Sequence, residues 1–402
     1  MLASVAKTCR LRVTAAARRW WFLAVSVVAG GTLVAASPAE ARDLVGRLAP
    51  VLVFVAAMSI VVNIAADAGA FEAVAAGMQR FTWRGLSASA ATWTQVVVLA
   101  MVSTVFLSLD TTAIMVTPLA VALARRSGVG MAAVGFAVVW IANIASLLLP
   151  VSNLTNLLAV SGGTFAGTGA YLSVMWRPAL VASAVVLVAS WIVYRWSERR
   201  RPAVETARRQ PVAFTGDGPR LRVSLIVLGC LLPLLVSPIP YWLTAIIGAL
   251  VLLGVTSREK LRAAAVTLIP WRSLLFVVAL SSSAAALHAL GAMDWMARLF
   301  SDGRQSAGGL LILGGVGAGL SNVINNIPAF LALDTVVDGT TRMAALLVGV
   351  NVGSIVTPWA SLATLLWHDQ LRRSGVDVPW RRYILAGAVL MPIAVILPIL
   401  AI

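Results

Sequence analysis

Long apolar runs recur from one end of the chain to the other, and short polar or basic segments separate them. Many of these runs reach roughly 18 residues, which is enough for a helix to cross a bilayer. After a first run at residues 20–36, the candidate spans are 47–66, 91–108, 131–149, 174–194, 223–237, 240–256, 273–290, 306–320, 342–356 and 383–402. A single soluble core could not hide so many apolar runs, so the pattern predicts an all-α polytopic membrane protein.

Four further apolar segments are too short or too interrupted to cross a bilayer alone. They are residues 109–126, 150–165, 321–337 and 357–367, and each contains a proline: Pro118, Pro150, Pro328 or Pro358. Proline removes a backbone donor and breaks a helix inside an apolar run. Backbone freed in this way at bilayer depth must be buried in protein or line a wet cavity. We therefore expect helix breaks at these four prolines.

The interrupted segments belong to an internal repeat. Three pairs of polar or helix-breaking residues share one separation of 208 residues: Asn143 and Asn351, Ser146 and Ser354, and Pro150 and Pro358. Such agreement is easy to reach by chance at apolar positions and hard to reach at these. The chain therefore divides into residues 1–46 with a first helix that also serves as a signal anchor, a first repeat at 47–194, a linker at 195–222 and a second repeat at 223–402.

Polar side chains gather beside the breaks in both halves, and corresponding broken segments in two halves point to a binding site at the midplane of the bilayer. The candidate substrate-binding residues are Asn143, Ser146, Ser152, Asn153, Thr155 and Asn156 in the first half, and Asn325, Asn326, Asn351, Ser354, Ser361 and Thr364 in the second. The competing interpretation is that these amides and hydroxyls only join helices to one another through hydrogen bonds.

Asp110 is the candidate proton-coupling residue. It lies in an apolar segment that has no basic neighbour, between Leu109 and Thr111. Ionisable residues at membrane depth are costly and by default indicate function, so Asp110 is expected to carry a proton or hold a cation. The alternative is that Asp110 caps the start of a helix, because aspartate followed by two threonines suits such a position.

Charge fixes the expected orientation. The chain has 31 lysine and arginine residues against 15 aspartate and glutamate residues, a net charge of +16. The basic residues lie in short loops, in the linker and in residues 1–19, so the positive-inside rule accounts for them and nucleic-acid binding is not expected. The sequence predicts a multi-pass protein of the cell (inner or plasma) membrane with a cytoplasmic N-terminus. Residues 38–41 resemble a signal cleavage site, but an uncleaved first helix is favoured.

Residues that would support enzymatic chemistry are scarce. The two cysteines, Cys9 and Cys230, and the two histidines, His288 and His368, show no metal-ligand spacing. Catalytic triads and phosphate-binding loops are also absent from the sequence. We expect no enzymatic activity, no cofactor and no metal. If the midplane site serves a transporter, that transporter must use an ion gradient or a separate ATPase subunit.

Several segments resemble the ArsB-type arsenite/antimonite efflux permeases. The stretch 109–118 resembles that family's Asn-Asp…Leu-Thr-Pro segment, and residues 141–146 followed by 151–156 resemble its Ala-Asp-Thr-Ala-Ser…Val-Ser-Asn-Leu-x-Asn. Residues 325–328 are similar to its Asn-Asn-x-Pro. The most specific likeness is 357–367, which is similar to Thr-Pro-x-x-Ser-Leu-Ala-Thr-Leu-Leu-Trp. Two positions depart from the family: Leu109 replaces an asparagine and Asn143 replaces an aspartate, which leaves fewer acids for proton coupling.

The resemblance implies the ion transporter superfamily fold, with about 10–12 transmembrane helices in two inverted repeats that each hold a re-entrant hairpin and a broken helix. It also implies export of arsenite or antimonite by proton antiport, sometimes assisted by a separate ATPase subunit. The alternative is a sodium-coupled di- or tricarboxylate transporter of the same superfamily, and a cation/proton antiporter comes third. The expected partners are the lipid bilayer, a small inorganic or carboxylate solute and H⁺ or Na⁺. Whether the chain forms a homodimer stays open.

Overall fold

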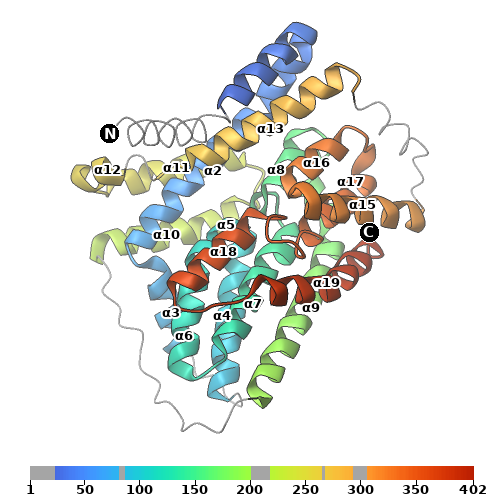
Figure 1. Cartoon of the computed structure of the whole chain (residues 1–402). Coiled ribbons are helices and arrows are strands. Elements are labelled where there is room, and N and C mark those ends of the chain that lie inside the picture. Colours follow the sequence, from blue (N-terminus) through green and yellow to red (C-terminus); the bar gives the residue numbers. More distant parts are fainter. Residues whose placement is uncertain (1–22, 81–86, 201–217, 265–267, 293–305) are drawn as a thin grey trace, which may run out of the picture.

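The computed structural model describes residues 23–80, 87–200, 218–264, 268–292 and 306–402. The basic segment 1–19 and most of the predicted linker lie outside these residues. Every regular element in the described part is helical (Figure 1). Within these described ranges, six helices are long and apolar enough to cross a membrane, and shorter apolar helices include Leu23–Ala36, Met131–Leu147 and Tyr241–Gly254. The predicted all-α polytopic architecture is confirmed.

The first half begins with the helix Leu23–Ala36, ends with a helix of 32 residues and contains two interrupted helices between them. Its further elements are α2 (Pro38–Asp67), α3 (Ala70–Arg80), α4 (Ala88–Phe106), α5 (Leu109–Thr111), the π-helical η1 (Thr112–Val116), α6 (Thr117–Ser127), α7 (Met131–Ile144), the 3₁₀ turns η2 (Ala145–Leu147) and η3 (Pro150–Ser152), α8 (Leu154–Ser161) and α9 (Thr168–Arg199).

The second half contains a similar series. Its elements are α10 (Gly218–Leu234), α11 (Tyr241–Gly254), α12 (Arg258–Ala264), α13 (Trp271–Ala289), α15 (Ala307–Ile324), α16 (Asn326–Asp334), α17 (Gly339–Leu347), the π-helical η4 (Val348–Val352), α18 (Leu362–Arg373) and α19 (Trp380–Ile399). In each half a helical hairpin (α4 to α6, or α15 and α16) precedes a broken helix (α7 and α8, or α17 and α18). A long helix, α9 or α19, then follows. The inverted relation between the halves stays a prediction.

The hairpins do not break at the predicted prolines. The first turns at Leu107 and Ser108, and helical structure then continues from Leu109 through Pro118. The second turns at Asn325, and Pro328 lies inside α16. Pro118 is tolerated because it follows the π-helical turn η1 and Pro328 because it lies in a first turn, where its missing N–H has no helical partner to lose. Pro150 and Pro358 do lie in the interruptions of the two broken helices.

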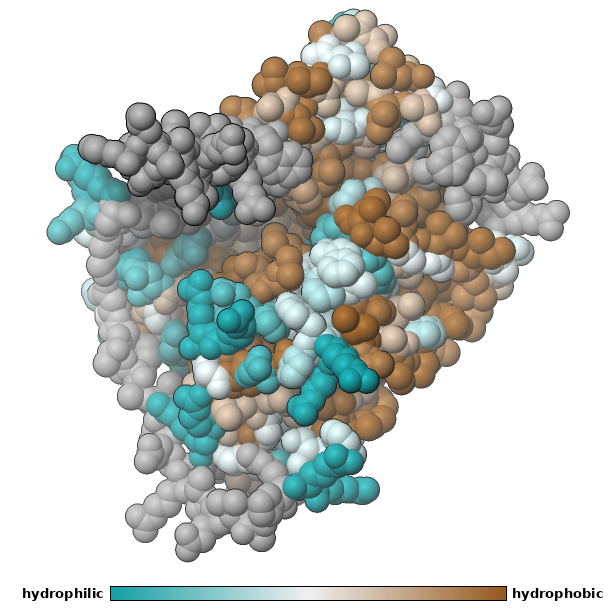
Figure 2. Space-filling model, in the orientation of Figure 1, coloured by the Kyte–Doolittle hydropathy of each residue, from teal (hydrophilic) through white to brown (hydrophobic). Residues whose placement is uncertain are grey.

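Close helix contacts in the second half depend on glycine. A Cβ atom added at Gly349 in η4 would collide with the backbone of Gly314 in α15. Small residues of this kind let the backbones of membrane helices approach one another. Figure 2 shows hydrophobic residues gathered on the right of the view, over α15 and α19, as expected for a surface that faces lipid.

We expect Gly349→Ala to destabilise the protein, although alanine is by itself the better helix former. Overpacking a tight site costs about 1–3 kcal/mol, more than the gain in helix propensity. The matched control is Gly315→Ala, because nothing lies within 4 Å of a Cβ atom added there. The melting temperature in detergent should fall for Gly349→Ala only. An equal effect of both substitutions would mean that the contact with Gly314 is not the cause.

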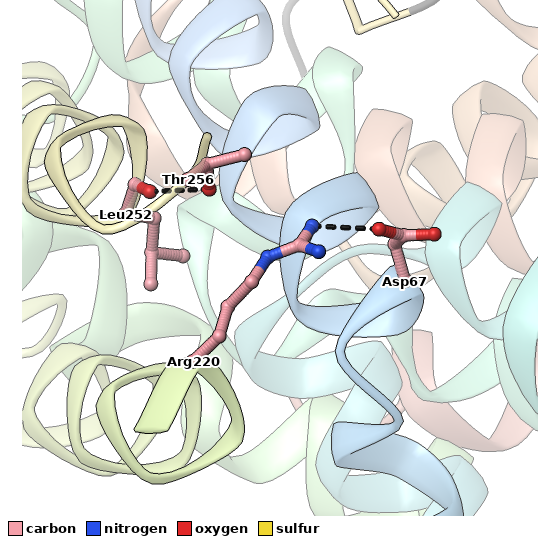
Figure 3. A network of polar contacts seen from close by, with 4 residues as sticks. All are labelled: Asp67, Arg220, Leu252 and Thr256. Carbon is pink, nitrogen blue, oxygen red and sulfur yellow. Dashed lines mark hydrogen bonds and ion pairs between the residues drawn. The ribbon is translucent and has the colours of Figure 1, made fainter. Parts of the chain in front are cut away.

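An ion pair joins the two halves at the end of the linker. Arg220, at the start of α10, lies 2.7 Å from the Asp67 carboxylate at the end of α2 (Figure 3). The arginine side chain is 7% exposed and the aspartate 62% exposed. Thr256 donates a hydrogen bond of 2.7 Å to the Leu252 carbonyl, close to the same arginine. The ends of α2, α10 and α11 therefore meet around one buried cation.

Asp67→Asn should lower the melting temperature, because the buried Arg220 guanidinium loses its ion pair with the Asp67 carboxylate. Asp369→Asn is the control, since Asp369 pairs with Arg373 at 2.7 Å within an exposed stretch of α18. Exposed pairs of that kind contribute little to stability. Differential scanning fluorimetry of both variants tests this comparison. A larger loss for Asp369→Asn would contradict it.

Candidate functional site

A cavity of about 640 Å³ is lined by both hairpin tips. Helices α2 and α13 supply further parts of its wall. The polar lining residues are Ser59, Asn63, Ser108, Asp110, Thr111, Asn153, Arg272, Ser273, Asn325, Asn326 and Ser361. Much of the remaining wall is apolar, with leucines from α8 and α18 among its residues. A largely apolar concavity with a few convergent polar groups is the usual form of a binding site for a small solute.

Both hairpin tips have unusual backbone geometry. Ser108 has a φ of 132° and Asn325 a φ of 93°, and among the described residues they are the non-glycine positions with positive φ. Each tip residue caps the helix that follows it. The Ser108 hydroxyl accepts a hydrogen bond from the Thr111 N–H at 3.2 Å, and the Asn325 side-chain oxygen accepts one from the Ile327 N–H at 3.2 Å. Strained positions of this kind cluster at ligand sites, which supports a functional role for the tips.

Four helices begin at the cavity wall. The residues that precede α5, α8, α16 and α18 are Ser108, Asn153, Asn325 and Ser361, and all four line the cavity. The start of a helix carries partial positive charge and unpaired N–H groups. The four starts therefore make the cavity receptive to oxygen atoms of a solute, whether neutral or anionic.

Asp110 lies in the first turn of α5 and lines the cavity. It is half-buried, and it is the one acidic residue among the lining residues that the structure describes. The residue that caps α5 is Ser108. The alternative interpretation of Asp110 as the helix cap is therefore not what the structure has. Within the described part of the chain no hydrogen bond or ion pair occupies the Asp110 carboxylate. It is therefore available to a solute or an ion in the cavity.

A buried hydrogen-bond cluster joins the two broken helices. The Thr155 hydroxyl donates to the Asn351 side-chain oxygen at 2.6 Å, and the Asn351 amide donates to the Asn156 side-chain oxygen at 2.8 Å. Asn156 in turn donates to the Ser146 carbonyl at 2.7 Å. All of these residues are at most 1% exposed. In this conformation they bind one another rather than line the cavity. This agrees with the competing interpretation, in which the polar side chains join helices to one another through hydrogen bonds.

The other buried candidates also bond within the protein. Asn143 donates to the Val139 carbonyl, Ser146 to Asn143, Ser152 to Ser146 and Leu149, and Ser354 to Asn351, while the Thr364 hydroxyl lies 3.1 Å from the Tyr383 hydroxyl. Of the twelve predicted binding residues, the structure thus places Asn153, Asn325, Asn326 and Ser361 at the cavity.

Several important residues were not among the predicted site residues. Asn322 anchors the second break: its side-chain oxygen accepts from the Thr357 N–H at 2.9 Å and its amide donates to the Gly353 carbonyl at 2.7 Å. Its position three residues before Asn325, in the same interrupted segment, could have identified it from the sequence. Asn63 and Arg272 reach the cavity from α2 and α13. A polar Asn63 inside an apolar span was a weaker signal, and nothing in the local sequence of Arg272 pointed to a binding site.

Comparisons with known proteins agree with this architecture. Residues 13–345 match a family described as citrate transporters. The chain is 26% identical over 393 residues to an arsenical pump membrane protein of Escherichia coli, covering 91% of this chain and 88% of that relative. It is 28% identical over 357 residues to one from Yersinia enterocolitica, covering 81% and 79%. An uncharacterized transporter of Mycobacterium tuberculosis is 23% identical over 367 residues, covering 85% and 82%.

The family match spans most of the chain and includes both hairpin tips and the first broken helix. The arsenical pump relatives extend the likeness at modest identity over nearly the full length. The protein therefore belongs to the citrate transporter family, in which it is a relative of the ArsB-type permeases.

Proposed function

We propose that this transporter exports arsenite or antimonite from the cell by proton antiport, with Asp110 as the proton carrier. The observation that carries the proposal is the cavity itself. It places one unoccupied carboxylate among hydroxyl groups, amides and four helix starts. The arsenical pump relatives supply the choice of solute.

The chemistry of the cavity suits an uncharged trihydroxy acid, which is the form of arsenite at neutral pH. Ser108, Thr111 and Ser361 can donate to or accept from its hydroxyl groups, and the amide of Asn326 can do both. No thiol of the described residues lines the cavity: Cys230 is on the exposed surface of α10, and Cys9 lies outside the described part of the chain. Oxygen and nitrogen contacts are weaker than thiolate bonds, which favours release.

The orientation that we propose puts the basic loops in the cytoplasm of a cell whose inner membrane holds the protein. Asn63 lines the cavity and donates to the Leu268 carbonyl at 3.3 Å, near the end of α2 where Asp67 pairs with Arg220. The cavity thus extends toward the side on which α10 begins after the basic linker. In the orientation that we propose, a cavity that extends toward the cytoplasmic side is suited to loading a solute for export.

The experiment uses a host that lacks its own arsenite exporters. Cells that produce the protein should retain less arsenite than cells with an empty vector, and everted vesicles should accumulate arsenite when a proton gradient is imposed. Membrane fractions confirm that the protein is present. Unchanged arsenite and antimonite retention with the protein in the membrane would overturn the proposed substrate.

A second candidate function is sodium-coupled transport of di- or tricarboxylates. The four helix starts and Arg272 at the cavity favour anions, and the matched family is described as citrate transporters. The discriminating assay is uptake of labelled citrate or succinate with and without sodium. Sodium-dependent uptake in the absence of arsenite export would replace the first proposal with this one.

A further inference from the structure

A second concavity, which shares no lining residue with the central cavity, lies where α9 and the end of α19 meet. It has a volume of about 460 Å³ and is lined by Trp176, Arg177 and Leu180 of α9 and by Leu400 and Ile402, which follow α19. Figure 1 shows the C-terminal end beside the first part of α9. Leu180 is 54% exposed and Leu400 57% exposed, so the groove opens onto the outer surface of the helices.

The position of the groove along α9 gives its depth in a membrane. Between Arg177 and Arg195 the helix has 17 residues and none of them is charged. At 1.5 Å per residue, the two arginines are about 27 Å apart. This distance is close to the thickness of the hydrocarbon core, about 30 Å. Arg177 therefore lies at one edge of the hydrocarbon core and Arg195 at the other, which is the level of lipid headgroups.

Helix α19 agrees with this depth. Its charged residues are Arg381 and Arg382 at its start, and no charged side chain follows Arg382 up to Ile402. The end of α19 consequently reaches the same membrane edge as Arg177. The groove is thus open to lipid at the headgroup level, on the face opposite the basic loops.

Arg177 has the chemistry of a phosphate ligand. Its guanidinium lies 5.2 Å from the ring centroid of Trp176, which is 46% exposed. In the part of the chain that the structure describes, Arg177 makes no ion pair. A planar guanidinium binds phosphate oxygens through two parallel hydrogen bonds, and tryptophan favours the membrane interface. Leu180 and Leu400 continue the groove into the hydrocarbon region as contacts for an acyl chain.

We propose that this groove binds the phosphodiester headgroup of an anionic phospholipid, with Arg177 on the phosphate and Trp176 beside the glycerol region. The competing explanation is that Arg177 only extends toward the interface and holds α9 at its depth, as basic side chains near helix ends do. Binding of a headgroup phosphate by Arg177 predicts a preference for anionic lipids, whereas an arginine that only holds the helix at its depth predicts none. The proposal does not depend on the proposed substrate, because the experiment measures lipid binding rather than transport.

The test uses the purified full-length protein in detergent, titrated with phosphatidylglycerol or with phosphatidylcholine and followed by native mass spectrometry. The wild type should retain phosphatidylglycerol in preference. Arg177→Gln should weaken that retention about tenfold, since it removes a charge-assisted contact. The matched control is Arg195→Gln: Arg195 also lies over a tryptophan, at 5.8 Å from the Trp191 ring, but is not among the residues that line this groove.

Equal retention of the two lipids, or equal losses in both variants, would overturn the proposal and leave Arg177 as an anchor of helix depth. A further arm adds inorganic phosphate. If free phosphate competes fully with the lipid at millimolar concentration, the groove is a phosphate site rather than a lipid site, and the proposal fails in that respect as well. Thermal stability of Arg177→Gln in the absence of added lipid shows that the variant is folded.

Discussion

Asp110→Asn should abolish proton-driven export and raise arsenite retention to the level of cells with an empty vector. The amide keeps the size of the side chain and its contacts but cannot carry a proton. Asp110 is the one acid among the described residues that line the cavity, so no neighbouring carboxylate is placed to replace it. In everted vesicles, arsenite accumulation by the wild type should follow the imposed proton gradient, whereas any residual flux through the variant should not.

Two variants make this result interpretable. Asp110→Glu retains a carboxyl group and should keep part of the coupled transport. Asp369→Asn removes an acid from an exposed ion pair of α18 and should transport like the wild type. Coupled export by Asp110→Asn at the wild-type rate would show that the proton is carried elsewhere, even if arsenite is the substrate.

Asn351→Leu is expected to have the second large effect, on both stability and transport. Leucine branches at the same atom and has the same number of side-chain heavy atoms, but it leaves the Thr155 hydroxyl and the Asn156 side-chain oxygen without their partner, at a site that is at most 1% exposed. An unsatisfied buried polar group costs about 1–3 kcal/mol. The broken helices should then separate more readily, which lowers the melting temperature and the amount of protein in the membrane.

A double-mutant cycle tests whether the cross-half hydrogen bond is the cause. Thr155→Val removes the hydroxyl that faces Asn351, and it should cost less in the Asn351→Leu background than in the wild type, because the partner is already gone. Strictly additive losses of stability would mean that Thr155 and Asn351 act independently.

The sequence predicted the order of elements well, because apolar length and interruption are local properties. The segments 109–126, 150–165, 321–337 and 357–367 correspond to the second arms of the hairpins and the second parts of the broken helices. Proline was a poor guide to the turn of each hairpin. A proline placed after a π-helical turn, or in the first turn of a helix, does not end the helix, and local sequence does not show which case applies.

The composition of the cavity was harder to predict. Asn153 and Ser361 stand beside breaks and could be found from the chain, as could Asp110 from its depth. Asn63 and Arg272 reach the cavity only because α2 packs against α8 and α13, and α13 packs against α16, which is a property of the tertiary structure. Conversely, the contact of Asn351 with Thr155 and Asn156 turns three predicted binding residues into partners of one another in this conformation.

That same contact has a consequence for how the protein can be assembled. Thr155 and Asn156 belong to the polypeptide before the linker and Asn351 to the polypeptide after it, yet each completes the other's hydrogen bonds in the interior. A fragment that ends after α9 would leave these groups without their partner and should be degraded when made by itself. A gene cut between α9 and α10 should therefore yield a working transporter only when both fragments are synthesised in the same cell, each acting as the chaperone of the other.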